Sequence, residues 1–285
     1  MPLWKIACVQ TDPRLADKEA NLAAMLRRLE EAAAHGARLV IFPECALTGY
    51  CFESKEEAWP LGETIPGPAT QALGAACRRL GVWAAFGLLE QRPADGALFN
   101  ACALVGPGVT LSYRKIHLPF LGVDRFTTPG DRPFAVHDLG GLRIGVTICY
   151  DGSFPEAARC LMLEGADLII LPTNFPAGAR SSLDVLVPAR ALENCVFFAV
   201  ANRCGEERGF RFIGRSRVLD VAGIVLASAS EEGEEIVYAE IDPEKARRKR
   251  IVHIPGKYEL DRIAHRRPEM YGPLTEAKSS EGKRS

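Results

Sequence analysis

The polar and apolar positions of this chain follow two alternating periods. Between residues 17 and 36 apolar side chains recur at helical spacing, at Leu22, Met25, Leu26, Leu29 and Ala33. Gly36 then closes the pattern, which predicts an amphipathic helix. The next six residues, ARLVIF at 37–42, form an apolar run of strand length, which predicts a strand covered on both faces.

The same alternation continues to about residue 241. Further helices are predicted at 68–80, 154–164 and 183–194. Further strands are predicted at 3–9, 82–89, 98–105, 109–115, 135–139, 142–149, 167–171, 196–201, 211–219, 223–228 and 235–241. Because helices alternate with single strands and with strand pairs, this order predicts a layered α/β protein with a mixed sheet rather than a purely parallel one.

One segment of the chain resembles another. HGARLVIFPECALTG at 35–49 and EGADLIILPTNFPAG at 164–178 both end a helix in Gly-Ala, continue into a buried strand and place Pro directly after it. Two such halves can pack their sheets face to face, with helices outside. A single match of this kind also arises by chance, so the pattern alone leaves an internal duplication open.

Composition excludes several classes of protein. The chain has 285 residues, 47% of them hydrophobic, and 35 Lys and Arg against 36 Asp and Glu, which is typical of a globular protein and not of a general nucleic-acid binder. The one basic cluster, KARRKR at 245–250, is interpreted as a solvated helix face or turn. Neither a membrane span nor an export signal is evident, and we expect a cytoplasmic protein with a polar, flexible tail at 275–285.

The nine cysteines do not form a recognisable disulfide or zinc pattern. Their number is odd, and no two are spaced C-x-x-C. We expect eight of them to be small buried hydrophobic residues: Cys8, Cys45, Cys51, Cys77, Cys102, Cys160, Cys195 and Cys204. The ninth, Cys149, has a different context.

Three reactive side chains stand where apolar runs stop. Glu44 follows ARLVIFP, Lys115 follows VTLSYR, and Cys149 follows GLRIGVTI. The ends of strands in α/β sheets commonly carry functional groups. Each residue taken alone also has an ordinary interpretation: Glu44 as a surface or capping acid, Lys115 as a solvated strand-end lysine, and Cys149 as one more core cysteine.

The sequence after Cys149 favours a nucleophile. Ser153 and Glu156 fit a capping box, with Pro155 in the first turn, which predicts a helix beginning four residues past the cysteine. Unpaired N–H groups at such a helix start would lower the pKa of the thiol and stabilise an oxyanion. A carboxylate such as Glu44 could carry protons to and from the sulfur, and Lys115 could favour the thiolate and hold the oxyanion.

Taken together, the three blocks resemble the signature blocks of the nitrilase (carbon–nitrogen hydrolase) superfamily. These are Phe-Pro-Glu44 with Thr48-Gly-Tyr50, Tyr113-Arg-Lys115-Ile-His-Leu-Pro119, and Cys149-Tyr-Asp-Gly-Ser-Phe-Pro-Glu156, in the order and with the separations of the family. Similarity extends over nearly the whole chain, including ALVGPGVTLSYRK, RALEN at 190–194, ANRCG at 201–205, FIGRS at 212–216 and RPEMYG at 267–272.

The resemblance implies a four-layer α-β-β-α sandwich of two mixed sheets, formed by one domain over residues 1–274. It implies Glu44 as general base, Lys115 as oxyanion stabiliser and Cys149 as nucleophile, with the backbone N–H of Tyr150 sharing the oxyanion role. It further implies a homodimer or larger homo-oligomer that associates through helices on one outer face, and neither a metal nor an organic cofactor.

One position departs from the family. Many relatives carry a second glutamate in the loop after the lysine block, whereas here the counterpart is Asp124, one methylene shorter. Asp124 is therefore our candidate second acid. Either it reaches the site through a shifted loop, or this role is weakened.

The family cleaves several kinds of carbon–nitrogen bond. Tyr150-Asp151 stand where nitrilases usually have Trp-Glu, and Gly152-Ser153 stand where several carbamoyl-amino-acid hydrolases and ω-amidases place a carboxylate-binding Arg, although Arg180 or Arg190 could supply one. We expect an amidase that acts on a small amide and releases ammonia; the alternatives are an N-carbamoyl hydrolase, a nitrilase and a non-catalytic module. Candidate substrate-binding residues are Tyr50, Phe120, Asn174 and Phe175.

Overall fold

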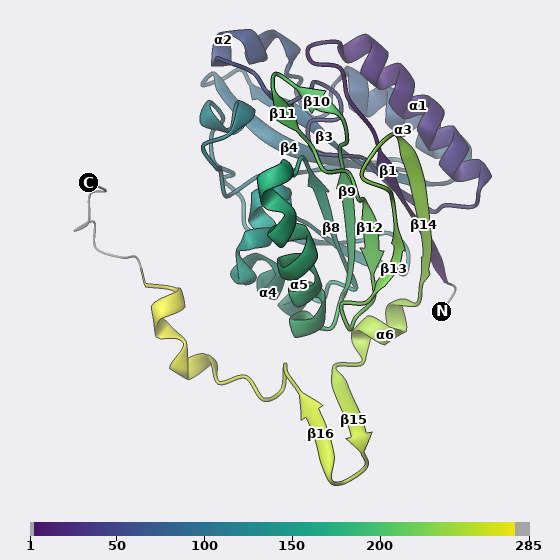
Figure 1. Ribbon diagram of the computed structural model, residues 1–285, viewed down its shortest axis with the longest axis vertical. Coiled ribbons are helices and arrows are strands. Elements are labelled where there is room, and N and C mark those ends of the chain that lie inside the picture. The colour runs from purple at the N-terminus through teal and green to yellow at the C-terminus, as the bar shows by residue number, and fades with distance from the viewer. Residues whose placement is uncertain (1–2, 277–285) are drawn as a thin grey trace. The chain divides into compact units, whose positions relative to one another are not determined.

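The computed structural model describes residues 3–276 (Figure 1). The chain divides into a large unit that ends at Arg247 and a small unit that begins at Arg248. The large unit holds both main sheets and every residue of the predicted site. Most of the tail expected at 275–285 lies outside the described residues.

The first sheet contains six strands in the order β14-β1-β2-β3-β4-β5. Their bounds are β1 Trp4–Gln10, β2 Leu39–Ile41, β3 Trp83–Arg92, β4 Ala97–Gly106, β5 Val109–Arg114 and β14 Glu235–Ile241. β1, β2 and β3 pair in parallel, while β14, β4 and β5 run antiparallel to their neighbours. The parallel centre is the apolar part, as expected for strands that are covered on both faces.

The second sheet also contains six strands, in the order β13-β12-β9-β8-β7-β6. Their bounds are β6 Val136–Asp138, β7 Arg143–Val146, β8 Leu168–Thr173, β9 Phe197–Asn202, β12 Arg217–Leu219 and β13 Val225–Ser228. β7, β8 and β9 pair in parallel, and β6, β12 and β13 are antiparallel to their neighbours.

The two sheets therefore have the same sequence of pairings. In each, an antiparallel edge strand precedes three parallel strands, and two antiparallel strands follow. The resembling segments 35–49 and 164–178 supply β2 and β8, which hold the same central position in their sheets. The similarity noticed in the sequence thus reflects two halves with one topology.

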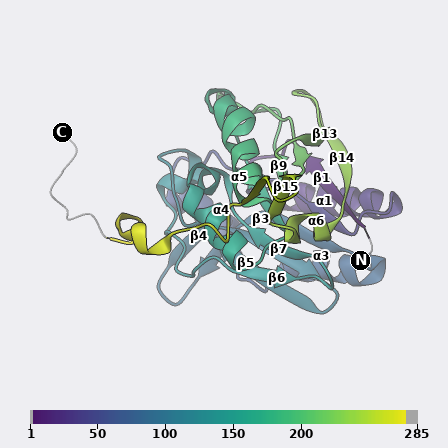
Figure 2. The same cartoon turned by 90° about the horizontal axis from the view of Figure 1, so that it is seen from below.

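Helices cover the outer faces of the two sheets. α1 Lys18–Ala34 and α3 Pro68–Leu80 lie on the first sheet, and α4 Pro155–Leu163 and α5 Val187–Asn194 lie on the second (Figure 1). In the view of Figure 2, α1 and α3 again lie apart from α4 and α5. The predicted stripe of α1 packs on the first sheet through Met25 and Leu29, which belong to one buried cluster with β1–β4. The predicted four-layer sandwich of two mixed sheets is confirmed.

The element boundaries differ from the prediction in several places. In the main sheets, the strand predicted at 211–219 is formed only by Arg217–Leu219, and the helix predicted at 183–194 begins with a π-helical turn at Ser182–Leu186. The capping box predicted at Ser153 and Glu156 is wrong: the chain enters a 3-10 turn at Cys149–Ser153, and α4 follows with Phe154 as its N-cap and no side-chain cap. Pro155 explains this, because the residue before a proline avoids helical geometry, and Phe154 is extended. The sequence patterns also missed the short elements α2 Lys55–Ala58, β10 Glu206–Glu207, β11 Phe210–Arg211 and α6 Pro243–Arg247.

The cysteines follow the prediction with one exception. All nine are free thiols, and Cys160 is exposed whereas the others are buried. Cys160 lies on the solvent side of α4, whose buried positions are Ala157, Ala158, Leu161 and Met162. In the described part of the chain, no helix has the length and apolar character needed to cross a membrane.

The small unit contains one hairpin. Its strands are β15 Arg250–Ile254 and β16 Tyr258–Asp261, which pair antiparallel. The pattern analysis predicted no strand here, because the only signal was the basic cluster at 245–250. That cluster divides between α6, where Arg247 forms ion pairs with Asp167 and Glu244, and the start of the hairpin.

Candidate active site

Glu44 lies in a tight turn directly after β2. Gly87 of β3 holds this turn: its N–H donates to the Pro43 carbonyl at 3.0 Å, and its own carbonyl accepts from Leu47 N–H at 3.2 Å. A Cβ added to Gly87 would lie 2.2 Å from the backbone nitrogen of Cys45, so only glycine permits this approach. The close packing buries the Glu44 side chain completely.

Lys115 and Cys149 also stand just past strand ends. Lys115 follows β5, its N–H donates to the Asn100 carbonyl of β4 at 2.8 Å, and its side chain is 0% exposed. Cys149 lies three residues past β7 and opens the 3-10 turn with φ of +44°, a left-handed backbone that non-glycine residues seldom adopt. The residue is buried, with 7% of its surface exposed.

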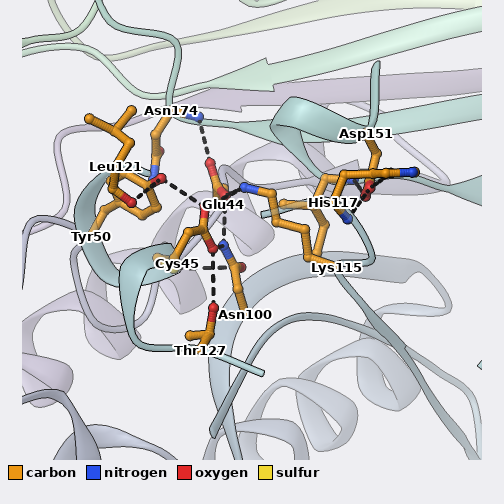
Figure 3. Close-up of polar contacts among 12 residues, drawn as sticks. Glu44, Cys45, Tyr50, Asn100, Lys115, His117, Leu121, Thr127, Asp151 and Asn174 are labelled. Atoms are coloured by element: carbon orange, nitrogen blue, oxygen red, sulfur yellow. Dashed lines mark hydrogen bonds and ion pairs between the residues drawn. The ribbon is translucent and has the colours of Figure 1, made fainter. Parts of the chain in front are cut away.

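Three ionisable side chains meet at the Lys115 ammonium group (Figure 3). Lys115 Nζ lies 2.7 Å from Glu44 Oε1 and 2.6 Å from Asp124 Oδ2, and all three side chains are buried. Asp124 comes from the 3-10 turn Gly122–Arg125, which brings its shorter side chain to the lysine. Of the two alternatives left open for Asp124, the structure has the one in which the carboxylate reaches the site.

Two neutral side chains complete the bonds of the carboxylates. Asn100 Nδ2 donates to Glu44 Oε1 at 2.7 Å and to Asp124 Oδ1 at 2.9 Å. The Tyr50 hydroxyl lies 2.8 Å from Asp124 Oδ2, and burial together with the Asp124 charge raises the pKa of Tyr50 well above its usual value. The backbone N–H of Asn174, just past β8, donates to Glu44 Oε2 at 3.0 Å.

The Cys149 thiol lies beside the side chain of Thr173 and the backbone N–H of Asn174, where the charges of Glu44 and Lys115 act on it. Burial, followed by the negative charge of Glu44, raises the pKa of Cys149 to about 12. The positive charge of Lys115 lowers this pKa, but by less than Glu44 raises it. The expectation of a lowered thiol pKa was therefore wrong, because tertiary burial outweighs both the ammonium group and the turn. The resting side chain is therefore a neutral thiol.

The same surroundings shift the pKa values of Glu44 and Lys115. Burial raises the pKa of Glu44 above its usual value, although the ion pair with Lys115 opposes this shift, and the neighbouring Asp124 charge adds to it. Burial alone would lower the pKa of Lys115, but Asp124 and Glu44 raise it well above its usual value, so the lysine stays protonated. A fixed positive charge thus stands beside a base with a raised pKa.

A third carboxylate, Asp151, ties the cysteine turn to the lysine segment. It accepts the Tyr113 hydroxyl at 2.7 Å, His117 Nδ1 at 2.7 Å and the backbone N–H of Ile148 at 3.0 Å. Tyr113 and His117 lie two residues on either side of Lys115. Asp151 therefore fixes the turn of Cys149 relative to the strand end that carries Lys115. Figure 3 shows its contact with His117.

Of the four candidate substrate-binding residues, three are buried and one, Phe120, is exposed. The side-chain amide of Asn174 is buried and has no hydrogen-bond partner, and Phe175 is buried with its N–H on Asn202. Tyr50 is buried against Asp124, whereas Phe120 is 90% exposed and lines a cavity of about 530 Å³ that Gly122 also lines.

Neither of the two arginines considered for binding a substrate carboxylate is available for that role. Arg180 forms an exposed bidentate pair with Glu231, and Arg190 donates to the carbonyls of Gly152 and Ser153, where it supports the cysteine turn. Sequence reasoning missed the roles of Asn100 and Asp151. Among residues 3–276, no group of His, Cys, Asp and Glu side chains is arranged to hold a metal ion.

Comparisons with known proteins agree with this geometry. A family model described as carbon-nitrogen hydrolase matches residues 5–251. A nitrilase of Pyrococcus abyssi is 43% identical over 252 residues, which cover 87% of this chain and 93% of that protein. The human omega-amidase NIT2 is 33% identical over 80% of this chain and 85% of its own length.

Solved structures give the same result. The amidase of Nesterenkonia sp. AN1 superposes with a TM-score of 0.79 at 27% identity, over 95% of this chain and 99% of that one. A double mutant of that amidase in complex with acrylamide has a TM-score of 0.74 at 27% identity, over 87% and 95% of the two chains. With these matches and the sandwich fold, the chain belongs to the nitrilase, or carbon–nitrogen hydrolase, superfamily.

Proposed function

We propose that this protein hydrolyses the amide bond of a small molecule and releases ammonia through a thioester on Cys149. The observation that carries the proposal is the buried Lys115 ammonium group, held at 2.7 Å from Glu44 and 2.6 Å from Asp124, together with a buried Cys149 thiol on which the charges of Glu44 and Lys115 both act. A base, a fixed cation and a nucleophile buried close together are the groups that acyl transfer requires.

The reaction begins with proton transfer. Because the pKa of Cys149 is about 12, the thiol is neutral near pH 7, and attack on the carbonyl carbon requires removal of its proton. Glu44, whose pKa is raised by burial, accepts that proton as the C–S bond forms. It then returns the proton to the amide nitrogen as the C–N bond breaks and ammonia leaves.

The developing oxyanion needs donors. Lys115 Nζ has three N–H groups, of which two are used by Glu44 and Asp124, so the third is free to point at the oxyanion. Tyr150 is the second residue of the 3-10 turn that Cys149 opens, a position whose backbone N–H has no partner within the turn. Glu44 then activates a water that hydrolyses the thioester and releases the acid.

Asp124 acts on Lys115 rather than on the substrate. Its Oδ2 accepts from Lys115 Nζ and lies 2.8 Å from the Tyr50 hydroxyl, and its Oδ1 accepts from Asn100. With both oxygens bonded, Asp124 has little capacity to accept a proton from a substrate. Its role in the proposed reaction is to keep the lysine charged and in place.

A small primary amide fits the pocket best. The unpartnered amide of Asn174 provides a donor and an acceptor next to Glu44, as a carboxamide requires, and Phe175 adds an apolar wall. Tyr50 would contribute through Asp124, and Phe120 through the neighbouring cavity. The amidase relative with acrylamide bound supports an amide substrate.

A nitrile is the second candidate, favoured by the 43% identical relative named as a nitrilase. N-carbamoyl compounds are a third class that the same nucleophile would cleave. We also propose that the protein is cytoplasmic and forms a homodimer or larger homo-oligomer. The exposed apolar residues Leu163 at the end of α4 and Leu192 on α5 support association through the outer helices.

The test is an ammonia-release assay over small primary amides, ω-amides, carbamoyl compounds and nitriles. We expect the primary amides to give the highest kcat/KM, and Cys149→Ala and Glu44→Gln each to abolish release. Cys160→Ser, which removes the exposed thiol, is the matched control and should leave the rate unchanged. Turnover by Cys149→Ala within tenfold of the wild type would refute the proposal, and a preference for nitriles would select the second candidate.

A further inference from the structure

Asn100 is a polar residue in the middle of an apolar strand. β4 reads ALFNACALVG, and all ten of its residues are buried. A buried side-chain amide costs free energy unless it is hydrogen-bonded, so its presence in this strand calls for partners. Every partner of Asn100 lies at the proposed catalytic centre.

Asn100 forms hydrogen bonds with Glu44 and Asp124 through its side chain and with Lys115 through its backbone. Its Nδ2 donates to Glu44 Oε1 at 2.7 Å and to Asp124 Oδ1 at 2.9 Å, and its backbone carbonyl accepts the N–H of Lys115 at 2.8 Å. Its Oδ1 accepts from the Cys45 thiol at 3.7 Å. The amide thus bridges the two carboxylates, which also share the lysine (Figure 3).

The chemistry of these neighbours determines the orientation of the amide. Ionised carboxylates only accept hydrogen bonds, so the NH₂ end of Asn100 must face Glu44 and Asp124. The reversed amide would place its oxygen against two negative charges. In the observed orientation each N–H of Nδ2 has one carboxylate partner, and the Cys45 thiol bonds the oxygen.

The bonds also distinguish the two oxygens of Glu44. Oε1 accepts from both Lys115 Nζ and Asn100 Nδ2, each at 2.7 Å. Oε2 accepts the backbone N–H of Asn174 at 3.0 Å, and this N–H also lies beside the Cys149 thiol. Oε2 is therefore the oxygen with lone-pair capacity left for the thiol proton.

We propose that Asn100 is a positioning residue of the reaction, which occupies Glu44 Oε1 and so presents Oε2 to the thiol as the proton acceptor. The inference rests on the proposed role of Glu44 as base. In this account Asn100 also holds Glu44 and Asp124 apart at fixed positions around Lys115, against the mutual repulsion of two buried charges.

The experiment compares Asn100→Leu and Asn100→Asp with a matched control, Asn21→Leu. Asn21 is also buried and makes three hydrogen bonds, to the backbone of Arg14 and of Leu47 at the end of the Glu44 turn, and none of them reaches a side chain of the site. The readouts are kcat and KM for the best amide, and the pH at which kcat/KM falls on the acid side. A purely structural asparagine would not move that pH.

Removing the donor leaves the charged form of Glu44 less stabilised, so its pKa must rise and the acid limb must move to higher pH. For Asn100→Leu we expect a shift of about one pH unit, the size of a hydrogen bond to a charged group, and a fall in kcat of about 10- to 100-fold from misplacement of the base. KM should change much less.

Asn100→Asp keeps the size of the side chain but adds a negative charge, so its acid limb should lie higher still. Asn21→Leu should keep the wild-type limb and kcat. If Asn100→Leu does not fold, the nearly isosteric Asn100→Asp gives the same comparison. An acid limb unchanged in the folded Asn100 variants, or an equal loss of kcat in Asn21→Leu, would overturn the inference.

The two proposals fail in different ways. If Glu44→Gln retains activity, the proposed base is wrong, and the role of Asn100 falls with it. If Glu44→Gln is inactive while the Asn100 variants keep the wild-type acid limb and kcat, the proposed function stands and only the positioning role of Asn100 is refuted.

Discussion

Replacement of Lys115 by methionine tests how the buried charges balance. In the wild type, two carboxylates and one ammonium group share a buried site, and Lys115 contacts Glu44 at 2.7 Å and Asp124 at 2.6 Å. Methionine keeps the length and apolar stem of the side chain but leaves two carboxylates facing each other. Asn100 then remains as the donor that bridges them.

The cost to stability follows from this geometry. Removing one partner of a buried ion pair costs about 3–5 kcal/mol. For a domain of this size each 1 kcal/mol lowers Tm by about 2–4 °C, so Lys115→Met should melt roughly 6–20 °C below the wild type. The double variant Lys115→Met/Asp124→Asn removes the excess negative charge and should regain at least half of that loss.

Activity should not recover with stability. Loss of one oxyanion donor lowers kcat by about 10²- to 10³-fold, and the double variant lacks the same donor. We therefore expect both variants to be at least about 100-fold slower in the ammonia-release assay. Lys245→Met, which changes an exposed lysine of α6, is the control and should leave both Tm and rate near wild type.

The effect on stability should depend on pH in a defined direction. Without the lysine, repulsion raises the folded-state pKa of one of the two carboxylates above its unfolded value. A carboxyl group whose pKa is higher in the folded state than in the unfolded state stabilises the folded protein at pH values below its unfolded-state pKa. This stabilisation is lost as the pH rises through its folded-state pKa. The deficit of Lys115→Met should thus be smaller at pH 5 than at pH 8. An unchanged rate, or equal Tm losses in the single and double variants, would refute the reasoning.

Two further substitutions test the supports of the site. Asp151→Asn keeps the side-chain size but weakens the bonds to Tyr113, His117 and Ile148, so kcat should fall about 10- to 100-fold with little change in KM; a wild-type kcat would show that Asp151 does not hold the cysteine turn. Gly87→Ala places a Cβ 2.2 Å from the Cys45 nitrogen and should cost about 1–3 kcal/mol in urea unfolding. Gly74→Ala in α3, whose Cβ would meet no atom closer than 4.0 Å, should instead stabilise by about 0.5–1 kcal/mol, and equal effects of the two would contradict the packing argument.

The fold was largely predictable because its signals are local. The run ARLVIF and the helical stripe before it gave β2 and α1, and the resemblance of 35–49 to 164–178 anticipated two halves of one topology. The missed elements α2 and β15 are short and carry little periodicity. The exposure of Cys160 could also have been predicted, since the helical spacing of its buried neighbours places it on the solvent side of α4.

The site was predictable only in part. Glu44, Lys115 and Cys149 stand at strand ends and in recognisable blocks, so the sequence indicated them. Asn100 had a weaker signal, as a polar residue inside an apolar strand, and its partners come from segments far along the chain. Residue spacing does not show such contacts.

The pKa of Cys149 was mispredicted for a related reason. The sequence showed a turn and a lysine, both of which favour a thiolate. It did not show the depth of burial or the approach of Glu44, which together raise the pKa of the thiol to about 12. This difference matters for the proposed reaction, because a neutral thiol requires a base before it can attack the substrate.

The most direct test of the central claim is the intact mass of the protein during turnover of its best amide, quenched in acid within the first turnovers. A Cys160→Ser background removes the exposed thiol. The account predicts an added acyl group that maps to the peptide containing Cys149, is released by hydroxylamine and is absent from Cys149→Ala. An acyl group on any other residue would contradict it, as would rapid accumulation of product by the Cys149→Ala variant.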